Sequence, residues 1–551
     1  MNLANLGLSG LTAAQVRLQT AGHNIDNAST DGYNRQSVQV STAGAGATGS
    51  GYVGWGVQVD SVTRSYDNFL YRQLVDSQST GAALASYGNQ ITQVNNLFAD
   101  PTVGISPAIQ NFFDSMQAVA SAPADSAARQ QLVGQAGSLV TSINSANAFL
   151  DQQRDNVNTQ ISTTVDQINS YVQRIQNLNV QITNAQASSS GQPPNDLLDQ
   201  RDQAVAELSQ IVDVKVLDQG GTFSLTVGNG QLLLGGNTVF PLKAVPSAAD
   251  PSRTVVAYSI PSGTGGAMTS VEMPEQAITG GSLGGLLSYR SQVLDTVQNS
   301  LGQLAAGLAM GVNALHEQGV DLNGDAGQEF FALGSPKVLA NAGNGGSAEI
   351  SASFATPPDS NALTGQDYKV QFDGSNYHVY TIPDGTELGS GSPTPDGIPG
   401  VTLSLSGTPQ AGDSWLVEPT RSTAASLALE ISDPAKIAAA DASGGSANGN
   451  VALQMAQLQT SKLLGGGTMS LNEAYSQIVN RVGVLTQQNA TASKAQTTLI
   501  QQNYAAQQAV SGVNLNEEYV NLDNYQEQFR AASRLIDVSS QLFDTLLNMA
   551  S

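Results

Sequence analysis

One long helical segment constrains the fold of this chain more than any other feature. Neither Gly nor Pro occurs between Ser138 and Ser190. A helix of that length spans roughly 75–80 Å at ~1.5 Å per residue, and Gly191-Gln192-Pro193-Pro194 ends it. Hydrophobic residues recur at seven-residue intervals on two adjacent lines: Leu150, Val157, Tyr171 and Leu178, with Thr164 as the polar exception, and Ile161, Ile168, Ile175 and Ile182. The pattern predicts an elongated molecule built around this helix.

The rest of the chain alternates between helical and β patterns. Helices are predicted over residues 1–25, from about Tyr66, over 195–212 and 281–316, and from Ala424 to the end apart from Gly-rich breaks. Short strands are predicted near Val38–Val40 and Val57–Val62, with a Gly/Ala/Ser loop over 43–51 between them. Alternating residues and turn signals predict two longer β regions, 213–275 and 321–420.

This order predicts a mainly α fold with β insertions. The N- and C-terminal helices pair as a coiled coil, long helices form a bundle, and two β-rich regions lie outward. The predicted units are a terminal helical domain (1–75 and 512–551), a bundle (76–212, 276–320 and 421–511), a first β-rich domain (213–275) and a second β-rich domain (321–420).

Apolar stripes run along both ends of the chain. The C-terminal stripe repeats every seven residues without exception and is widened by neighbouring side chains; its predicted interface residues are Leu515, Leu522, Tyr525, Phe529, Ile536, Leu542, Phe543 and Leu546. The N-terminal stripe follows the same period, and its predicted interface residues are Leu8, Leu11, Leu18 and Ile25. Asn514 and Glu517 resemble a capping box at the start of the last helix.

These two stripes need partners beyond one chain. Five buried anchors contribute about 7–15 kcal/mol, whereas ordering ~35 residues costs about 35–70 kcal/mol of backbone entropy. The N-terminal stripe is the obvious partner within the chain, but two stripes form a thin, exposed pair. We therefore expect neighbouring copies to complete the burial and both ends to be poorly ordered in the monomer. Proton NMR of the monomer tests this expectation.

Charge and composition narrow the range of expected partners. The chain has 44 acidic and 21 basic residues and a net charge of -23, so neither nucleic acid nor an anionic membrane surface is an expected partner. The absence of Cys excludes disulfides and thiolate chemistry. The start lacks the pattern of a cleavable signal peptide, and no apolar run reaches the length of a membrane span. Composition alone allows a cytoplasmic protein or one exported without signal cleavage.

No catalytic, cofactor or metal site is predicted, and the chain is not expected to be an enzyme. His316-Glu317 begins like a zinc-protease motif, but Val320 stands where the second histidine belongs. Asp321, Asn323 and Asp325 imitate a calcium loop that lacks its Gly and its final Glu, so a polar turn is expected. Asp196, Asp199 and Asp202 lie at the start of a helix, where their negative charges interact favourably with the helix dipole. Arg201 can pair with them locally.

Four motifs resemble known proteins. Residues 24–35 (NIDNASTDGYNR), together with the Gly56-Val57-Gln58-Val59 segment, resemble the N-terminal signature of flagellar rod, hook and hook-associated proteins, with Asp26 departing from the expected small apolar residue. Residues 511–518 (SGVNLNEE) and 542–548 (LFDTLLN) resemble their C-terminal signature. Residues 195–202 (NDLLDQRD) and 316–324 (HEQGVDLNG) narrow the resemblance to the hook-associated protein 1 family.

The resemblance implies a structural subunit of the extracellular flagellum at the hook–filament junction. Such proteins leave the cell unfolded through the flagellar type III export apparatus. Their terminal helices build an inner tube, their long helices surround it, and their β domains project outward. Expected partners are other copies in a ring, the hook protein, the next junction protein on the filament side, and a cytosolic export chaperone at the C-terminal helix. The alternatives are a hook or distal-rod subunit, a secreted cell-wall hydrolase or an adhesin.

Overall fold

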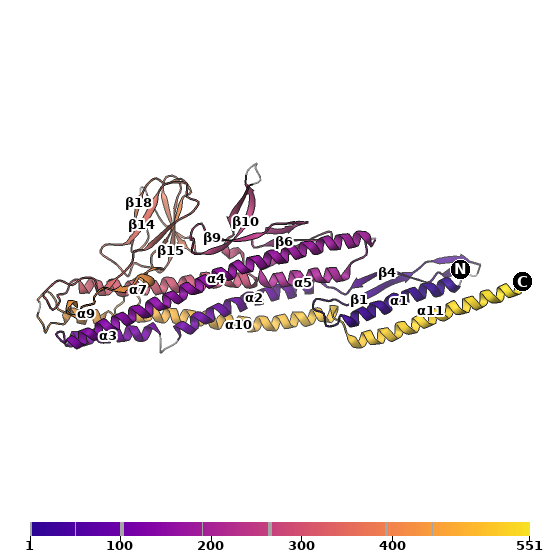
Figure 1. Cartoon of the computed structure of the whole chain (residues 1–551), viewed down its shortest axis with the longest axis horizontal. Coiled ribbons are helices and arrows are strands. Elements are labelled where there is room, and N and C mark those ends of the chain that lie inside the picture. The colour runs from indigo at the N-terminus through magenta and orange to yellow at the C-terminus, as the bar shows by residue number, and fades with distance from the viewer. Residues whose placement is uncertain are drawn as a thin grey trace.

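The protein is an elongated helical rod with β-rich regions on one side (Figure 1). The computed structural model describes residues 3–49, 51–99, 104–189, 191–262, 267–391, 395, 397–443 and 445–550. Both chain ends lie at the same end of the rod, and the C-terminal helix extends beyond the N-terminus (Figure 1). The predicted mainly α fold with β insertions and paired terminal helices is confirmed.

Long helices form the body of the rod. Its helices are α2 (Asn68–Phe98), α3 (Ile105–Ser121), α4 (Ser126–Ser188), α5 (Asn195–Ile211), α6 (Gly281–Tyr289), the π-helical η2 (Arg290–Leu294), α7 (Asp295–His316), α9 (Asn450–Gln457) and α10 (Leu471–Ser511). α2 packs along α10 and α6, and α4 packs against α3 and α5. Ser470 and Glu473 form a capping box that starts α10.

Helix α4 confirms the predicted central helix and is longer than expected. Its two predicted apolar lines are buried, apart from Tyr171, which is half-buried. The helix begins at Ser126, where the Asp125 side chain accepts a hydrogen bond from the Ala127 amide. It therefore runs through Gly134 and Gly137, whose low helix propensity is outweighed by the burial of Leu132 and Leu139.

Two groups of strands cover the same side of the rod (Figure 1). The first contains a four-stranded sheet, β5 (Val214–Gln219), β6 (Thr222–Val227), β7 (Gln231–Gly235) and β8 (Thr238–Val239), and a three-stranded sheet of β9 (Leu242–Pro246), β10 (Thr254–Ser262) and β11 (Ala267–Glu272). The second contains a five-stranded sheet, ordered β13-β19-β15-β16-β17, and the pair β14–β18. Its strands are β13 (Lys337–Ala340), β14 (Glu349–Phe354), β15 (Asp367–Phe372), β16 (Tyr377–Ile382), β17 (Glu387–Gly391), β18 (Val401–Ser406) and β19 (Ser414–Glu418).

Two predictions of local structure are wrong. Residues 43–51 were expected to form a loop, but β2 (Ala45–Thr48) and β3 (Gly51–Gly54) pair there as a hairpin beside β1 (Gln36–Thr42) and β4 (Val57–Arg64). Small residues fit this hairpin because Gly44 and Gly46 lie against the Trp55 ring.

The segment that follows Ala424 was expected to be helical, but most of it up to Ser470 is irregular. Among the residues of this segment that the structure describes, the named elements are α8 (Thr423–Ser426), β20 (Ala428–Leu429), which pairs with β12 (Phe331–Ala332), the 3-10 turn η3 (Pro434–Lys436) and α9. Tertiary hydrogen bonds replace helical ones, since the Arg129 guanidinium donates to the carbonyls of Pro434 and Ile437. Ile437 itself is fully buried.

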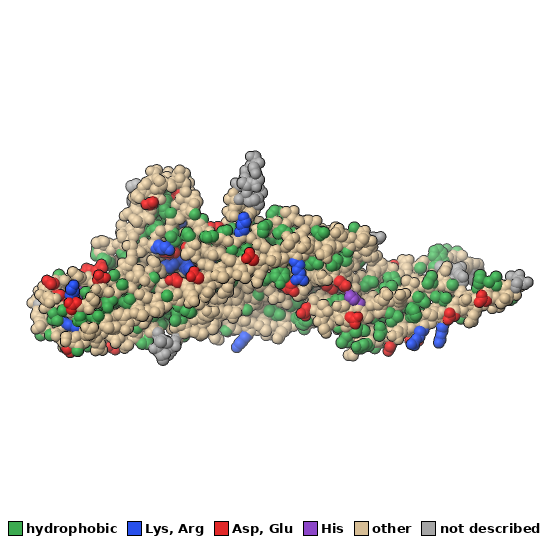
Figure 2. Space-filling view, in the orientation of Figure 1, with side chains coloured by type: hydrophobic (Ala, Val, Ile, Leu, Met, Phe, Trp, Pro, Cys, Tyr) green, Lys and Arg blue, Asp and Glu red, His purple; other side chains and the backbone are tan. Residues whose placement is uncertain are grey.

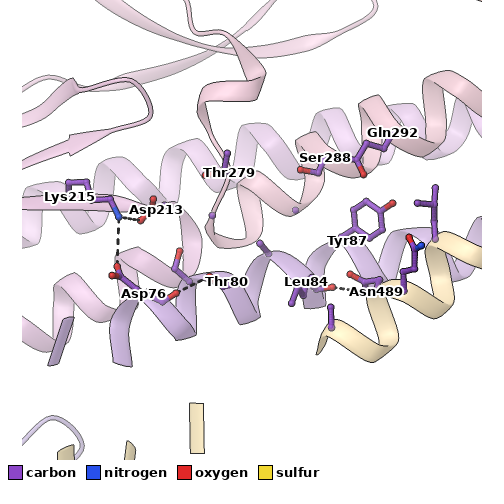
Figure 3. A pocket seen from close by; sticks show the side chains of 17 residues that line it. Asp76, Thr80, Leu84, Tyr87, Asp213, Lys215, Thr279, Ser288, Gln292 and Asn489 are labelled. Atoms are coloured by element: carbon purple, nitrogen blue, oxygen red, sulfur yellow. Dashed lines mark hydrogen bonds and ion pairs between the residues drawn. The ribbon is translucent and has the colours of Figure 1, made fainter. Parts of the chain in front are cut away.

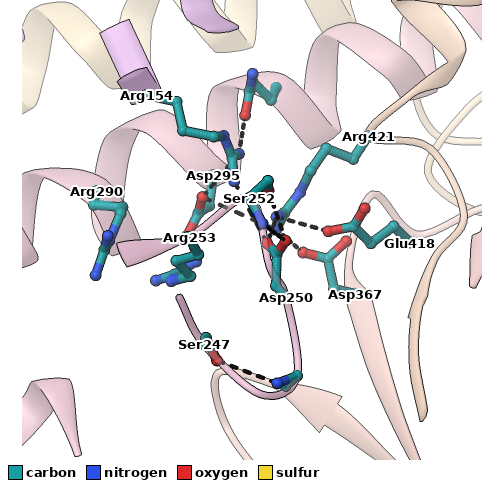
Figure 4. Close-up of polar contacts among 12 residues, drawn as sticks. Arg154, Ser247, Asp250, Ser252, Arg253, Arg290, Asp295, Asp367, Glu418 and Arg421 are labelled. Carbon is teal, nitrogen blue, oxygen red and sulfur yellow. Dashed lines mark hydrogen bonds and ion pairs between the residues drawn. The ribbon is translucent and has the colours of Figure 1, made fainter. Parts of the chain in front are cut away.

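A buried ion-pair cluster fastens both β groups to the rod (Figure 4). Arg421, which follows β19, pairs with Asp367 and lies 2.8 Å from Glu418, both from the second β group. It also lies 3.8 Å from Asp250 of the first β group and 4.0 Å from Asp295 of α7. Arg421 therefore joins three parts of the molecule.

The other charged side chains of this cluster also form ion pairs. Arg154 of α4 lies 3.2 Å from Asp295, and Arg253 of β10's entry turn lies 2.7 Å from the same carboxylate. Arg253 also lies 2.9 Å from Glu275 of the 3-10 turn η1 (Glu275–Ala277), which pairs in turn with the fully buried Arg290 at 2.7 Å. Burial alone would raise the pKa of Asp295, but Arg253, Arg421 and Arg154 hold it far below its usual range.

Candidate assembly interface

The two chain ends form an antiparallel helix pair. Helix α1 (Leu3–Asp26) packs along α11 (Leu515–Ala550), and α11 continues past the start of α1 (Figure 1). Asn24 Nδ2 lies 3.2 Å from Glu518 Oε2 at one end of the pair. Further along, the Arg17 guanidinium lies 5.6 Å from the centroid of the Tyr525 ring, an arrangement that stabilises a cation against an aromatic face.

Small residues let the two helices approach closely. A Cβ atom at Gly7 would lie 2.8 Å from Ile536 Cγ1 and 3.1 Å from the Ala532 carbonyl oxygen. Gly7, Ala14 and Ala21 are all buried and recur every seven residues. At about 100° per residue, Leu11, Leu18 and Ile25 of the predicted stripe lie about 40° from this small-residue line, and Leu8 lies about 100° from it.

Three of the predicted N-terminal residues therefore flank the line of α1 that meets α11 most closely, and Leu8 lies further from it. Leu8 is exposed, whereas Leu11, Leu18 and Ile25 are half-buried. The signal that marks the contact is the repeat of Gly and Ala, which permits close packing and was hidden by the larger leucines beside it. The role of Leu8, Leu11, Leu18 and Ile25 as a subunit interface stays a prediction.

Gly7→Val is expected to loosen the helix pair, because the added atoms overlap Ile536 and the α11 backbone. Overpacking of this kind costs about 1–3 kcal/mol. Hydrogen exchange of the amides around Ala532 and Ile536 should accelerate in this variant. Gly22→Val is the matched control, because nothing lies within 4 Å of a Cβ at Gly22 in the same helix. Equal protection in both variants would show that the close contact at Gly7 is unimportant.

Helix α11 is only partly covered by α1. Leu522, Tyr525, Phe529 and Ile536 of the predicted interface are half-buried. Leu515, Leu542, Phe543 and Leu546 are exposed, the last two by 60% and 62%. The exposed apolar residues beyond Ser540, which we call the C-terminal tip, are Leu542, Phe543, Leu546, Leu547 and Met549. Figure 2 shows hydrophobic side chains at this end of the molecule.

A polar joint connects the helix pair to the bundle. Asn24 is buried, donates to the Gln36 carbonyl at 2.9 Å, and accepts from the Gln36 amide and the Tyr33 hydroxyl. Arg35 Nε donates to Glu518 Oε1 at 2.7 Å, and the Arg35 amide donates to the Ser511 carbonyl. The two terminal motifs noted in the sequence therefore contact one another directly.

The motif at residues 195–202 completes this joint. Arg64 of β4 lies 2.7 Å from both Asp199 and Asp202, and Asn34 donates to Asp199 through its amide at 2.9 Å and its side chain at 2.6 Å. Burial raises the pKa of Asp199 and of Asp202, while Arg64 opposes the shift. The expectation that Arg201 pairs locally is not what the structure shows, since its guanidinium stacks 3.5 Å from the Phe223 ring centroid and donates to Asn179.

Candidate chemical sites are occupied by structural contacts. His316 is fully buried; its ring nitrogens meet the Gln328 carbonyl and the Ala438 amide, and burial lowers its pKa. The Asp321 carboxylate accepts from the amides of Asn323 and Asp325, which makes the calcium-like segment a polar turn. Within the described ranges, no group of three or more His, Asp or Glu side chains is arranged to hold a metal ion. Among these described residues, no helix is both apolar enough and long enough to cross a membrane.

One cavity of about 700 Å³ lies between α2, α6 and α10 (Figure 3). Lys215 at its edge lies 3.3 Å from Asp213 and 3.8 Å from Asp76. Asn489 of α10 donates to the Leu84 carbonyl of α2 across the cavity wall. Its lining residues, all described, include no histidine to act as a base, and these polar groups already hold elements together.

Comparison with known proteins identifies the architecture. Residues 91–331 match the family model "Flagellar hook-associated protein FlgK helical domain", 339–419 match "Flagellar hook-associated protein 1, D2-like domain", and 501–549 match "Flagellar basal body rod FlgEFG protein C-terminal". Flagellar hook-associated protein 1 of Escherichia coli (strain K12) is 39% identical over 555 residues, covering 100% of both chains. The protein of that name from Bacillus subtilis (strain 168) is 25% identical over 576 residues, covering 98% of this chain and 96% of that one.

A solved structure agrees with these matches. The flagellar hook junction protein FlgK from Burkholderia pseudomallei superposes with a TM-score of 0.74 at 32% identity, covering 80% of this chain and 100% of that one. A helical rod with paired ends and lateral β groups, matched along its length in this way, is a structural protein of the bacterial flagellum. The chain belongs to the flagellar hook-associated protein 1 family.

Proposed function

We propose that this chain joins the flagellar hook to the filament and acts by assembly, without catalysis. The observation that carries the proposal is the C-terminal tip, an exposed apolar helix end on a chain of net charge -23. Exposed apolar clusters on a soluble surface mark sites of association. The partners in this proposal are other copies in a ring, the hook protein, and the next hook-associated protein on the filament side.

The role that we propose for each domain follows from its place in the rod. Residues 1–75 and 512–551 form an inner tube, the bundle of 76–212, 276–320 and 421–511 surrounds it, and the β regions 213–275 and 321–420 project outward. The lateral position of both β groups supports this arrangement (Figure 1). The half-buried residues of the two predicted stripes would then complete their burial against neighbours.

We infer that the chain reaches its site outside the cell through the flagellar type III export apparatus. The absence of Cys suits a chain that must cross unfolded, because no disulfide can trap it. In this inference a cytosolic chaperone covers the stripe of α11 before export. The same apolar residues that later bind neighbours would otherwise associate too early.

Replacing Phe543 and Leu546 with Asp is expected to abolish assembly and swimming, because two charges would enter an apolar subunit contact. Both side chains are exposed, so thermal unfolding of the monomer should change by no more than about 0.5 kcal/mol. Motility plates and immunoblots of sheared flagella measure the effect.

Gln541→Asp with Thr545→Asp is the matched control for this pair. It adds the same two charges to the same two turns, and at about 100° per residue both positions lie about 160° from Phe543, while Gln541 lies about 140° and Thr545 about 100° from Leu546. Both residues are exposed. The control should swim. Normal flagella in the Phe543/Leu546 variant would refute assembly through the C-terminal tip.

A further inference from the structure

The β2–β3 hairpin presents a second exposed apolar surface at the same end of the rod. The strands pair in the register Gly46↔Val53 and Ala47↔Tyr52. Tyr52 is 81% exposed and Val53 54%, and Trp55 follows directly, also exposed. Tyr52 and Val53 are consecutive in β3 and therefore point to opposite faces of the hairpin; we call these two side chains and Trp55 together the hairpin surface. Aromatic side chains of this kind dominate protein interfaces when a partner covers them.

Close contacts fix the base of the hairpin surface. The Trp55 ring lies against β2, where a Cβ at Gly46 would come within 2.8 Å of its Nε1, and the Trp55 amide donates to the Gly44 carbonyl at 2.8 Å. Gly56 has a positive φ of 104° and a Cβ there would lie 2.2 Å from Ser9 Oγ of α1. A pre-formed surface loses little conformational entropy on binding, so this geometry favours a docking site.

The absence of charge suits a contact between copies. No Asp, Glu, Lys or Arg occurs in residues 1–16 or 36–59, although the whole chain carries a net charge of -23. Identical subunits with that charge repel one another wherever acidic surfaces meet. The C-terminal tip has a matching character, since Asp544 is the sole charged residue between Val538 and Ser551.

Within one chain, α1 separates the hairpin from the length of α11 on which α1 packs. Ser9 of α1 contacts the hairpin side, and Gly7 contacts α11. These residues are two positions apart, which places them on nearly opposite sides of a helix at about 100° per residue. Figure 1 agrees, with α1 between the β1–β4 pair and α11. When two different patches meet only between molecules, the contact is head-to-tail. Such contacts close into rings or build helices.

We propose that the hairpin surface is the docking site for the C-terminal tip of a second copy of this chain. The inference rests on the proposed function, because it specifies which surfaces meet when copies assemble. Each subunit then offers its tip to one neighbour and its hairpin to another.

Cysteine cross-linking tests this contact directly, because the chain has no native Cys. The full-length variant carrying Tyr52→Cys and Leu546→Cys is expressed in flagellated cells that lack the wild-type copy. On oxidation, assembled flagella should yield covalent dimers and larger multimers of the protein, and the dilute monomer should yield none. Disulfides form only where the two Cα atoms lie within about 7 Å. Val53→Cys with Phe543→Cys is a second pair that decides the question if the first does not enter flagella.

The control pair is Tyr52→Cys with Gln541→Cys, which lies on the far face of the same helix end and should not cross-link. Flagella that contain the protein but give no more multimers from either test pair than from the control would overturn the docking site and leave the proposed function standing. Loss of the proposed function would show instead as wild-type protein missing from flagella.

Discussion

Removing residues 512–551 is expected to leave a folded, soluble rod that no longer joins hook to filament, so cells should be non-motile and should release flagellin into the medium. The deletion removes all of α11 and with it the C-terminal tip. It also removes Glu518, the partner of Arg35 and Asn24, so α1 loses the helix along which it packs. An isolated helix of the length of α1 is marginal in water, and α1 should therefore lose order.

The bundle should tolerate this loss. Its core contains residues such as Ile91, Phe112, Ile161 and Leu301, all fully buried and remote from α11. Circular dichroism should show lower helix content with the cooperative melt of the bundle retained. Immunoblots of purified flagella measure incorporation, and blots of the medium measure shed flagellin. Truncated protein at wild-type abundance in flagella would contradict a role for α11 in assembly.

The long helix could be predicted from sequence because its signal is local. Ile161, Ile168, Ile175 and Ile182 specify one buried face whatever lies opposite it. The start of α4 was missed because Gly134 and Gly137 normally weaken a helix, and only tertiary packing of Leu132 and Leu139 offsets that cost.

The irregular segment after Ala424 could not be predicted for the opposite reason. Its alanines favour a helix locally, but its backbone finds partners far away in sequence. Val320 exchanges backbone hydrogen bonds with Ala440, and Arg129 binds the carbonyl of Ile437. No sequence window contains such pairs, so local propensity gave the wrong answer.

The candidate site shows the same limit at the level of single side chains. The terminal stripes could be read from periodicity, yet Gly7 rather than Leu8 sets how closely α1 approaches α11. The motif containing Asp199 was recognised from resemblance alone; its contact with Arg64 spans 135 positions. Polar joints of this kind depend on topology, which the alternation of residue types does not encode.

Arg421→Met is expected to destabilise the attachment of the second β group by about 3–5 kcal/mol, because it leaves Asp367 and Glu418 buried without their main cation. Trp415 is buried in the same sheet, so its fluorescence during urea unfolding reports this region once Trp55→Phe removes the other tryptophan. Arg174→Met is the control, since Arg174 and Glu207 form an exposed pair at 3.2 Å worth at most about 1 kcal/mol.

The loss of unfolding free energy caused by Arg421→Met should shrink as the pH falls from 7.5 to 5. Burial raises the pKa of Asp367 and of Glu418, and Arg421 opposes that shift in the wild type. Removing Arg421 raises both pKa values further, so on acidification the folded variant binds protons that the unfolded chain does not bind, and acid relieves the cost of buried charge. Asp295 keeps Arg253 and Arg154 in both proteins, so its own loss of stability in acid largely cancels in the difference. A deficit no larger than that of Arg174→Met, or one that widens on acidification, would show that Arg421 does not compensate these carboxylates.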